Sequence, residues 1–203
     1  LQISLALSLQ LGTIISGQTR TISFNLSETA APATFTSSDV TATNGTISNF
    51  SGSGSSYTAL FTPTSNFEGS AAISVAAGVM TDLAANPNAA SATVTLLVDT
   101  LAPTATLAAT AATSSENEIT FTVTANEAID CSTLAVGAGI DFLVTNGALI
   151  SIDQTTDRLC TMNLLANATR GSPKTVSITS ASTFSISDAN GNQRLSLLGA
   201  PAT

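Results

Sequence analysis

Apolar and polar residues alternate in short runs along the chain, and the first run makes every odd position from Leu1 to Leu11 apolar. A period of two residues is typical of a β-strand that buries one face. Runs of the same kind recur in both halves of the chain, among them 22–26, 57–61, 73–75, 94–98 and 119–123. Turn-forming Gly, Asn, Asp and Pro residues separate the runs about every 8–12 residues, and no run has a convincing helical period. The pattern predicts an all-β chain of short strands that pack as sandwiches.

The opening run from Leu1 to Leu11 is longer than a typical strand of about five or six residues. One interpretation divides it into a first strand and a following edge segment of its own domain, with turns near Gly12 and Gly17. Alternatively, the run is donated to a neighbouring subunit, because an edge strand is a template for pairing. We favour the first interpretation, since the glycines follow at a distance that suits a hairpin.

Polar landmarks of the first half recur in the same order in the second half. Glu28, Asn44 and Asp82 correspond to Glu127, Asn146 and Asp188. The three offsets grow from about 99 to about 102 and about 106 residues, as loop insertions produce in a tandem duplicate. The sequence therefore predicts two copies of one fold.

The stretch Val98–Thr104 lies between the two copies and reads Val-Asp-Thr-Leu-Ala-Pro-Thr. Pro103 lacks a backbone N–H and holds Ala102 in an extended conformation, so the stretch is a stiff connector. Asp99 places one carboxylate at this joint. We expect a domain at 1–98, a linker at 99–103 and a second domain at 104–203.

Several motifs occur together in the first half and at the junction, namely Thr21–Phe24, Ser27–Glu28, Asn44–Gly54, Tyr57–Pro63, Asn66–Gly69 and Val98–Thr104. With these motifs, residues 1–104 resemble the bacterial Ig-like repeats of large secreted adhesins. The resemblance is weaker beyond residue 104, where the Asn-Phe-Glu-Gly corner is missing and two cysteines appear. It implies two tandem Ig-like β-sandwiches arranged end to end in a surface-exposed rod, often with calcium at the joints, and it does not imply an enzyme.

The chain is acidic, with 13 Asp and Glu against 5 Lys and Arg and a formal net charge of −8. Negative charge disfavours phosphate backbones and anionic membrane surfaces, so we expect no nucleic acid and no membrane insertion. The hydrophobic content of 43% and the regular patterning are unlike those of disordered segments. The expected partners are neighbouring repeat domains or subunits of the same fibre, and a host or surface ligand stays open.

The residues needed for the common kinds of catalysis are missing from the sequence. Without His there is neither a Ser-His-Asp nor a Cys-His arrangement, and Lys174 is the single lysine, beside Pro173 at a turn. Glu116 and Glu118 could imitate a glycosidase pair, but a solvated face explains them better. With no Trp and only Tyr57, platforms for stacking sugars are scarce. We therefore expect a protein that is not an enzyme.

Both cysteines, Cys131 and Cys160, fall in the second half. A pair in an acidic, lysine-poor chain suits a disulfide in an oxidising compartment, and the alternative is two buried free thiols. A metal or catalytic use of the pair lacks a His partner. The pair predicts a disulfide and an extracellular or cell-surface location.

Carboxylates around the joint predict a calcium site. In an Ig-like sandwich the B–C loop and the F–G loop lie at the end where the chain enters. Glu127 falls in the predicted B–C loop, Asp188 and Asn192 fall in the F–G loop, and the entering linker carries Asp99. Calcium takes about six to eight oxygen ligands from carboxylates, carbonyls and water, which such a set can supply. Alternatively, Asp188 and Asn192 only cap their own turn through side-chain-to-backbone hydrogen bonds.

An equivalent set in the first half consists of Glu28, Asp82 and Asn86. We expect this set to be incomplete, because no linker carboxylate precedes it in the chain. Near the other end, Gly199-Ala200-Pro201 resembles the junction, but Leu197 stands four residues before Pro201 where a carboxylate would be needed. A further calcium joint is not expected there.

Together these features predict a non-enzymatic structural or spacer module of a bacterial cell-surface or secreted fibre. In this interpretation calcium can rigidify the module. Two alternatives stay open: an Ig-like module that binds a glycan or a protein, and a virion or tail-fibre decoration module. An exposed aromatic surface in a hollow would favour the first alternative.

Overall fold

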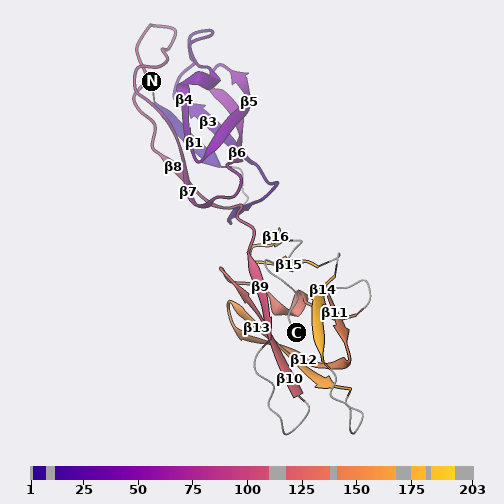
Figure 1. The fold of residues 1–203 in the computed structure, drawn as a ribbon. Helices are drawn as coiled ribbons and strands as arrows, with labels where there is room; N and C mark the ends of the chain where they lie inside the picture. Colours follow the sequence, from indigo (N-terminus) through magenta and orange to yellow (C-terminus); the bar gives the residue numbers. More distant parts are fainter. Residues whose placement is uncertain are drawn as a thin grey trace. The chain divides into compact units, whose positions relative to one another are not determined.

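The computed structural model describes residues 2–7, 12–109, 118–137, 141–167, 175–181 and 184–194. In these ranges the chain is all-β, apart from two 3₁₀ turns, η1 (Ser37–Asp39) and η2 (Cys131–Thr133). None of the described segments forms a helix with the length and apolar character needed to cross a bilayer. The chain divides into two compact units, Leu1–Leu101 and Ala102–Thr203, and Figure 1 shows the strands of each. The division between Leu101 and Ala102 falls inside the predicted linker.

The first unit contains two four-stranded sheets. One sheet is antiparallel with the order β1-β3-β6-β5, formed by β1 (Ile3–Leu7), β3 (Arg20–Leu26), β6 (Ser56–Pro63) and β5 (Gly45–Ser53). The other has the order β2-β8-β7-β4, formed by β2 (Ile14–Ile15), β8 (Val94–Asp99), β7 (Glu68–Val75) and β4 (Val40–Thr43). All pairs in the second sheet are antiparallel except β2 with β8.

The core of the first unit lies between these sheets and follows the period of two. Ile22, Phe24 and Phe61 from the first sheet and Ile73 and Val98 from the second are at most 2% exposed and belong to one cluster. Ser and Thr take most of the alternate positions of β3, β6, β7 and β8, with Leu60 and Leu97 among the exceptions. The arrangement is the β-sandwich that the alternation predicts.

The opening segment pairs within its own unit. β1 runs antiparallel to β3 in one sheet, whereas β2 runs parallel to β8 in the other. Gly12 and Gly17 flank β2 with φ angles of 121° and 77°, which residues with a side chain rarely adopt. The pairing of the described residues confirms the self-domain interpretation, while Leu1 and 8–11 lie outside the described residues.

The second unit contains an antiparallel sheet with the order β12-β13-β10-β9 and two shorter pairs. The sheet is formed by β9 (Ala105–Ala109), β10 (Glu118–Ala125), β12 (Gly147–Thr156) and β13 (Leu159–Ala166). The pairs join β11 (Phe142–Thr145) to β14 (Ser177–Ser180) and β15 (Ile186–Ser187) to β16 (Gln193–Arg194). Several residues considered in the sequence of this half lie outside the described ranges, namely Glu116, Pro173, Lys174, Leu197, Gly199, Ala200 and Pro201.

The second unit repeats the strand pairing of the first. Its four-stranded sheet has the neighbours β9-β10-β13-β12 where the first unit has β1-β3-β6-β5. Val123 lies opposite Cys160 as Phe24 lies opposite Tyr57. The tight turns repeat as well, because Asn44 and Asn146 both have positive φ and donate from Nδ2 to a carbonyl oxygen, 2.8 Å and 2.9 Å away.

A disulfide joins Cys131 and Cys160, as the sequence predicts, so the described chain holds no free thiol. Cys131 lies in η2, and Cys160 lies on β13 with its side chain in the core beside Met162 and Leu164. The bond therefore fixes the loop that follows β10 to the centre of the four-stranded sheet.

Candidate functional site

The Asp82 side chain closes a turn in the first unit. Its Oδ1 accepts hydrogen bonds from the backbone N–H groups of Ala84 and Asn86, at 2.8 Å and 2.9 Å. Its Oδ2 accepts a third from Nδ2 of Asn86, at 2.9 Å. These bonds hold the pKa of Asp82 below its ordinary value of 3.8, the Asn86 side chain having the largest effect. The turn is therefore built around an ionised carboxylate.

Asp188 closes the corresponding turn of the second unit with the same set of bonds. Its Oδ1 accepts from the backbone N–H groups of Asn190 and Asn192, at 2.8 Å and 2.9 Å. Its Oδ2 accepts from Nδ2 of Asn192, at 2.7 Å. Asp188 and Asn192 are both buried, at 5% and 3% exposure. The structure thus contains the turn-capping interaction that the sequence left open as an alternative.

Capping does not use all the acceptor capacity of this carboxylate. An ionised carboxylate has about four lone-pair positions, and the Asp188 side chain accepts three of the hydrogen bonds described above. A cation can therefore share the Asp188 oxygens with the turn. Capping and calcium binding are compatible at this residue.

The loop that carries Glu127 lies beside the Asp188 turn. Ile129, two residues after Glu127, forms an antiparallel bridge with Asp188. A carboxylate oxygen of Glu127 lies within 4.8 Å of one of Asp188. Two carboxylates this close repel each other, and a cation between them would offset the repulsion. The second unit thus brings together Glu127, Asp188 and Asn192, three of the four residues predicted for the joint.

The first unit arranges the equivalent residues less closely. Ala30 forms a bridge with Asp82, as Ile129 does with Asp188, so the Glu28 loop adjoins the Asp82 turn. Glu28 itself is exposed, whereas Glu127 is half-buried. Asp82 and Asn86 are joined by hydrogen bonds, but no contact joins Glu28 to them among the interactions of the described residues.

Asp99 ends β8 rather than beginning the linker, so the strand extends one residue further than the sequence predicts. Its Oδ1 accepts a hydrogen bond from the backbone N–H of Leu101, at 3.3 Å. Within the first unit, Asp99 lies opposite Glu68 in the β7–β8 pair. Two acidic residues directly opposite each other are unfavourable in a sheet, and a cation would offset this. Glu68 belongs to the Asn-Phe-Glu-Gly corner and is not among the residues predicted for the calcium site.

Sequence reasoning also missed a clamp on the chain that enters each unit. In the second unit, Asn126 accepts from the Thr104 N–H through Oδ1, at 2.6 Å, and donates its own N–H to the Thr104 carbonyl, at 3.0 Å. In the first unit, Ser27 binds Gln2 in the same two-way manner, at 2.9 Å and 3.0 Å. The available signal was that Ser27 and Asn126 both directly precede the repeated glutamate.

A comparison with known protein families agrees with this fold. Residues 3–98 match the sequence model of a family described as a bacterial Ig-like domain. No curated protein matches the chain. The structure is similar to that of Yersinia pseudotuberculosis InvD, with 19% identity, a TM-score of 0.37 and coverage of 100% of this chain. It is also similar to the adhesin InvE of the same organism, with 14% identity, a TM-score of 0.28 and coverage of 95%. The chain spans 56% of the length of each of those two chains.

Proposed function

From the premise that residues 3–98 are a bacterial Ig-like domain, we propose that the chain is a non-enzymatic spacer module of a cell-surface or secreted fibre. The observation that carries this proposal is the repetition of one structural plan in both units, down to single hydrogen bonds. Each unit clamps its entering chain with the residue before a glutamate and closes a neighbouring turn with an Asp–Asn pair. Modules that repeat such end features can be joined one after another.

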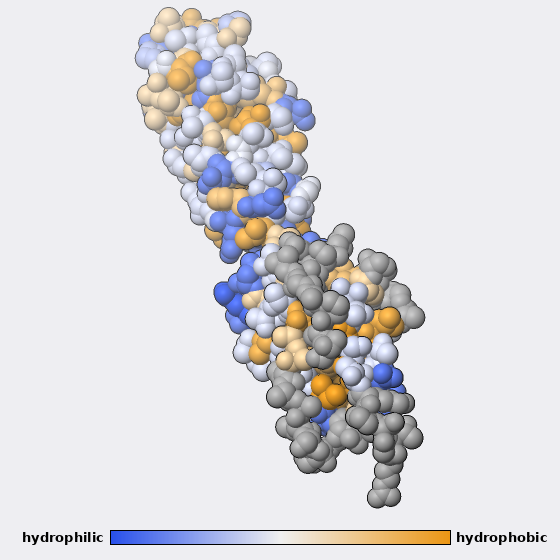
Figure 2. Space-filling model, viewed as in Figure 1, coloured by the Kyte–Doolittle hydropathy of each residue, from blue (hydrophilic) through white to orange (hydrophobic). Residues whose placement is uncertain are grey.

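An adhesin-like surface location fits the covalent chemistry and the surface of the chain. The disulfide is stable in oxidising compartments such as the bacterial periplasm and cell exterior. Figure 2 shows polar and apolar residues interspersed over the visible face of the first unit. Partners on this proposal are neighbouring repeat domains or subunits, together with a surface ligand of the whole fibre.

We further propose that calcium stiffens the joint through Asp99, Glu127, Asp188 and Asn192. The support comes from chain order, which places Asp99 just before the second unit, and from the grouping of the other three within that unit. All four residues offer oxygen ligands, the type that calcium prefers. A bound calcium ion would coordinate neighbouring carboxylates and offset their negative charge. Glu28, Asp82 and Asn86 would form a weaker equivalent set in the first unit.

Solution scattering of the full chain with calcium and with EGTA tests both proposals. A single compact globule of this length has a radius of gyration of about 17 Å, so tandem modules should give a clearly larger value. Chelation should increase the spread of dimensions without loss of β-sheet circular dichroism. A radius near that of a compact globule would refute the spacer proposal.

Calorimetric titration with calcium chloride tests the ligands separately. Asp99→Asn and Asp188→Asn should each weaken binding about tenfold or more, because each removes a charged ligand. Asp157→Asn is the matched control, since Asp157 is an exposed carboxylate of the second unit outside the proposed set. No measurable heat of binding, or an equal effect of Asp157→Asn, would refute the calcium site while leaving the spacer proposal intact.

A further inference from the structure

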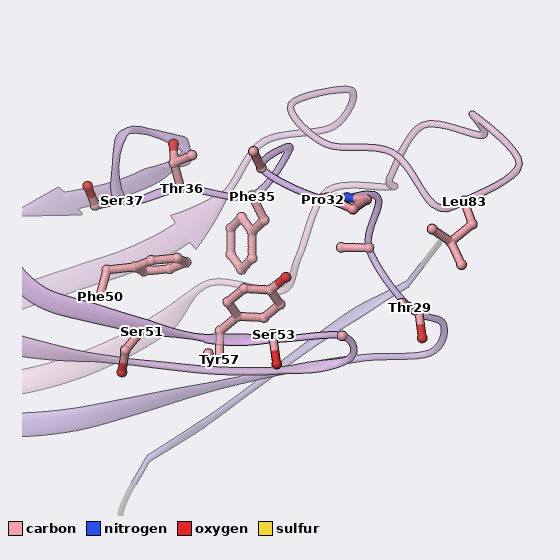
Figure 3. A pocket seen from close by; sticks show the side chains of 14 residues that line it. Thr29, Pro32, Phe35, Thr36, Ser37, Phe50, Ser51, Ser53, Tyr57 and Leu83 are labelled. Atoms are coloured by element: carbon pink, nitrogen blue, oxygen red, sulfur yellow. The ribbon is translucent and has the colours of Figure 1, made fainter.

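The first unit has a pocket of about 620 Å³ that the spacer function does not use. The segment after β3 and the hairpin between β5 and β6 form its walls, and Leu83 lies at its edge (Figure 3). The volume falls in the usual range for ligand pockets, about 300–1,000 Å³. None of the residues that line it is charged.

Aromatic rings form the floor of the pocket. Phe35 contacts Phe50 and Tyr57 edge to face, with 5.0 Å between ring centroids in both pairs. The segment that carries Phe35 is held in place, because Thr34 donates from Oγ1 to the Ala31 carbonyl at 2.8 Å. The wall is therefore formed before any ligand arrives, which lowers the entropic cost of binding.

The Tyr57 hydroxyl is the polar group that points into this space. Tyr57 is 8% exposed, and its hydroxyl makes no hydrogen bond to the part of the chain that the structure describes. Figure 3 shows the hydroxyl directed between Phe35 and Pro32, whereas the hydroxyls of Ser51 and Ser53 point to the other side of the hairpin. The hydroxyl faces the open pocket, so it is available to donate a hydrogen bond to a ligand there.

Leu83 adds apolar surface at the edge of the pocket. It is 70% exposed, the largest value among the exposed large hydrophobic side chains described. Its position is set by the Asp82 turn, whose hydrogen bonds hold the backbone on either side of it. An exposed leucine beside an apolar hollow marks a surface that a ligand can cover.

A side chain crosses the same place in the second unit. Cys160 occupies the position of Tyr57 there, and Gln154 occupies that of Gly52. The Gln154 side chain bridges the gap, since it donates to the Ile129 carbonyl at 3.1 Å and accepts from the Cys131 N–H at 2.9 Å. The pocket thus depends on Gly52 and Tyr57 of the first unit, which the second unit replaces by Gln154 and Cys160.

The charge around the pocket selects the kind of ligand. Glu28, which is exposed, directly precedes the lining residue Thr29, and Asp39 accepts hydrogen bonds from the lining residue Thr36. Arg20 is the only Lys or Arg in residues 1–101, and it lies at the far end of β3 from the pocket. A neutral pocket with an acidic rim favours an apolar group flanked by positive charge.

We propose that this pocket binds an extended peptide in which an apolar residue lies between cationic residues. The apolar side chain packs against the half-buried Phe50 and the exposed Leu83, and a peptide carbonyl accepts the hydrogen bond of Tyr57. A neutral sugar fits less well, because Phe35 and Tyr57 are 4% and 8% exposed and offer no open ring face for stacking. This binding function is additional to the spacer role and does not depend on it.

The test uses the full chain in EGTA and the blocked peptide acetyl-Lys-Pro-Leu-Pro-Lys-amide, whose prolines favour an extended conformation. Amide chemical shifts of Gly54 and Leu83 should change saturably, with a dissociation constant of about 1 mM or tighter. A peptide with both Lys replaced by Glu, or with Leu replaced by Gly, should bind at least about fivefold more weakly. Added salt should weaken binding of the Lys peptide by a similar factor.

Two variants and one control locate the site. Tyr57→Phe keeps the ring and removes the hydroxyl, so it should weaken binding about three- to tenfold. Leu83→Ala should weaken it by a similar factor, whereas Leu97→Ala should have no effect, because Leu97 is also exposed (62%) but does not line the pocket. The proposal would be overturned if the peptide caused no saturable shift below about 10 mM or if the Gly peptide bound equally well. It would also be overturned if methyl β-galactoside bound more strongly or if Tyr57→Phe had the affinity of the wild type.

Discussion

Single polar side chains hold the turns of this protein in place, and each of them satisfies several backbone N–H groups at once. Asp82 and Asp188 each accept two backbone hydrogen bonds and one from an asparagine side chain. Buried Asp141 similarly accepts from the N–H groups of Ala135 and Ser185, which joins two loops of the second unit. Loss of such a carboxylate leaves several donors without a partner, which costs more than the loss of one surface contact.

The ionised state of Asp82 predicts a pH dependence of the first unit. Because its pKa is lower in the folded state than the ordinary value of 3.8, its stabilising effect is complete above that value. The effect is lost as the pH falls through the lower, folded-state pKa. Denaturant unfolding followed by tyrosine fluorescence reports on the first unit alone, since Tyr57 is the only Tyr and the chain has no Trp. The unfolding free energy should fall below about pH 4 in the wild type.

Asp82→Asn should remove most of this acid-dependent step and lower stability at pH 7. Glu28→Gln is the control, because Glu28 is exposed and lies in the neighbouring loop. The prediction fails if Asp82→Asn keeps the full acid-dependent step or if Glu28→Gln removes as much of it.

At the scale of elements, the two units solve the same packing problem by different means. In the first unit, the loop after β3 packs on the sheet through Phe35, whose ring lies 5.5 Å from that of Phe24. In the second unit, the corresponding loop is fixed by the bond from Cys131 to Cys160. Aromatic packing and a covalent link thus hold equivalent loops, and the aromatic one lines a pocket in the first unit.

The disulfide predicts a large difference in stability that is confined to the second unit. The bond closes a chain segment between residues separated by 29 positions, and the chain-entropy model gives about 3–4 kcal/mol for such a loop. The double variant Cys131→Ala/Cys160→Ala should therefore unfold at lower urea concentration when followed by circular dichroism. Tyrosine fluorescence should report an unchanged transition of the first unit. A shift of less than about 1 kcal/mol, or an equal shift of the Tyr57 signal, would contradict this.

At the scale of the whole molecule, the chain consists of two self-contained cores. The core cluster of the first unit runs from Ile14 to Val98 and that of the second from Ala105 to Ile186, with no shared residue. Each unit also closes its own entering chain through the clamp on Gln2 or Thr104. Such units should fold independently when calcium is absent.

A fragment of residues 1–101 tests this independence. In EGTA its tyrosine fluorescence transition should have the same midpoint as that of the full chain, because no core residue is removed. The circular dichroism transition of the full chain should equal the sum of those of fragments 1–101 and 102–203. A fragment 1–101 that is unfolded, or whose unfolding free energy differs by more than about 1 kcal/mol, would show that the units stabilise each other.

Local sequence determined much of the secondary structure of this protein, because a strand with one buried face requires a period of two. The alternation at Ile22, Phe24 and Leu26 predicts β3, and all three side chains are buried. The repeated Glu, Asn-Gly and Asp landmarks indicated the two copies, and their Asp–Asn turns are formed by residues close in sequence. The two cysteines indicated their bond because the chain offers no other pair.

Only the tertiary structure decided the features that depend on pairing between distant strands. A period of two shows which residues share a face, but it does not specify which strand lies alongside. The opposition of Glu68 and Asp99 results from the register of β7 and β8, which local sequence leaves open. The pocket likewise forms because Phe35, Tyr57 and Leu83 come from three segments that meet only when both sheets are packed.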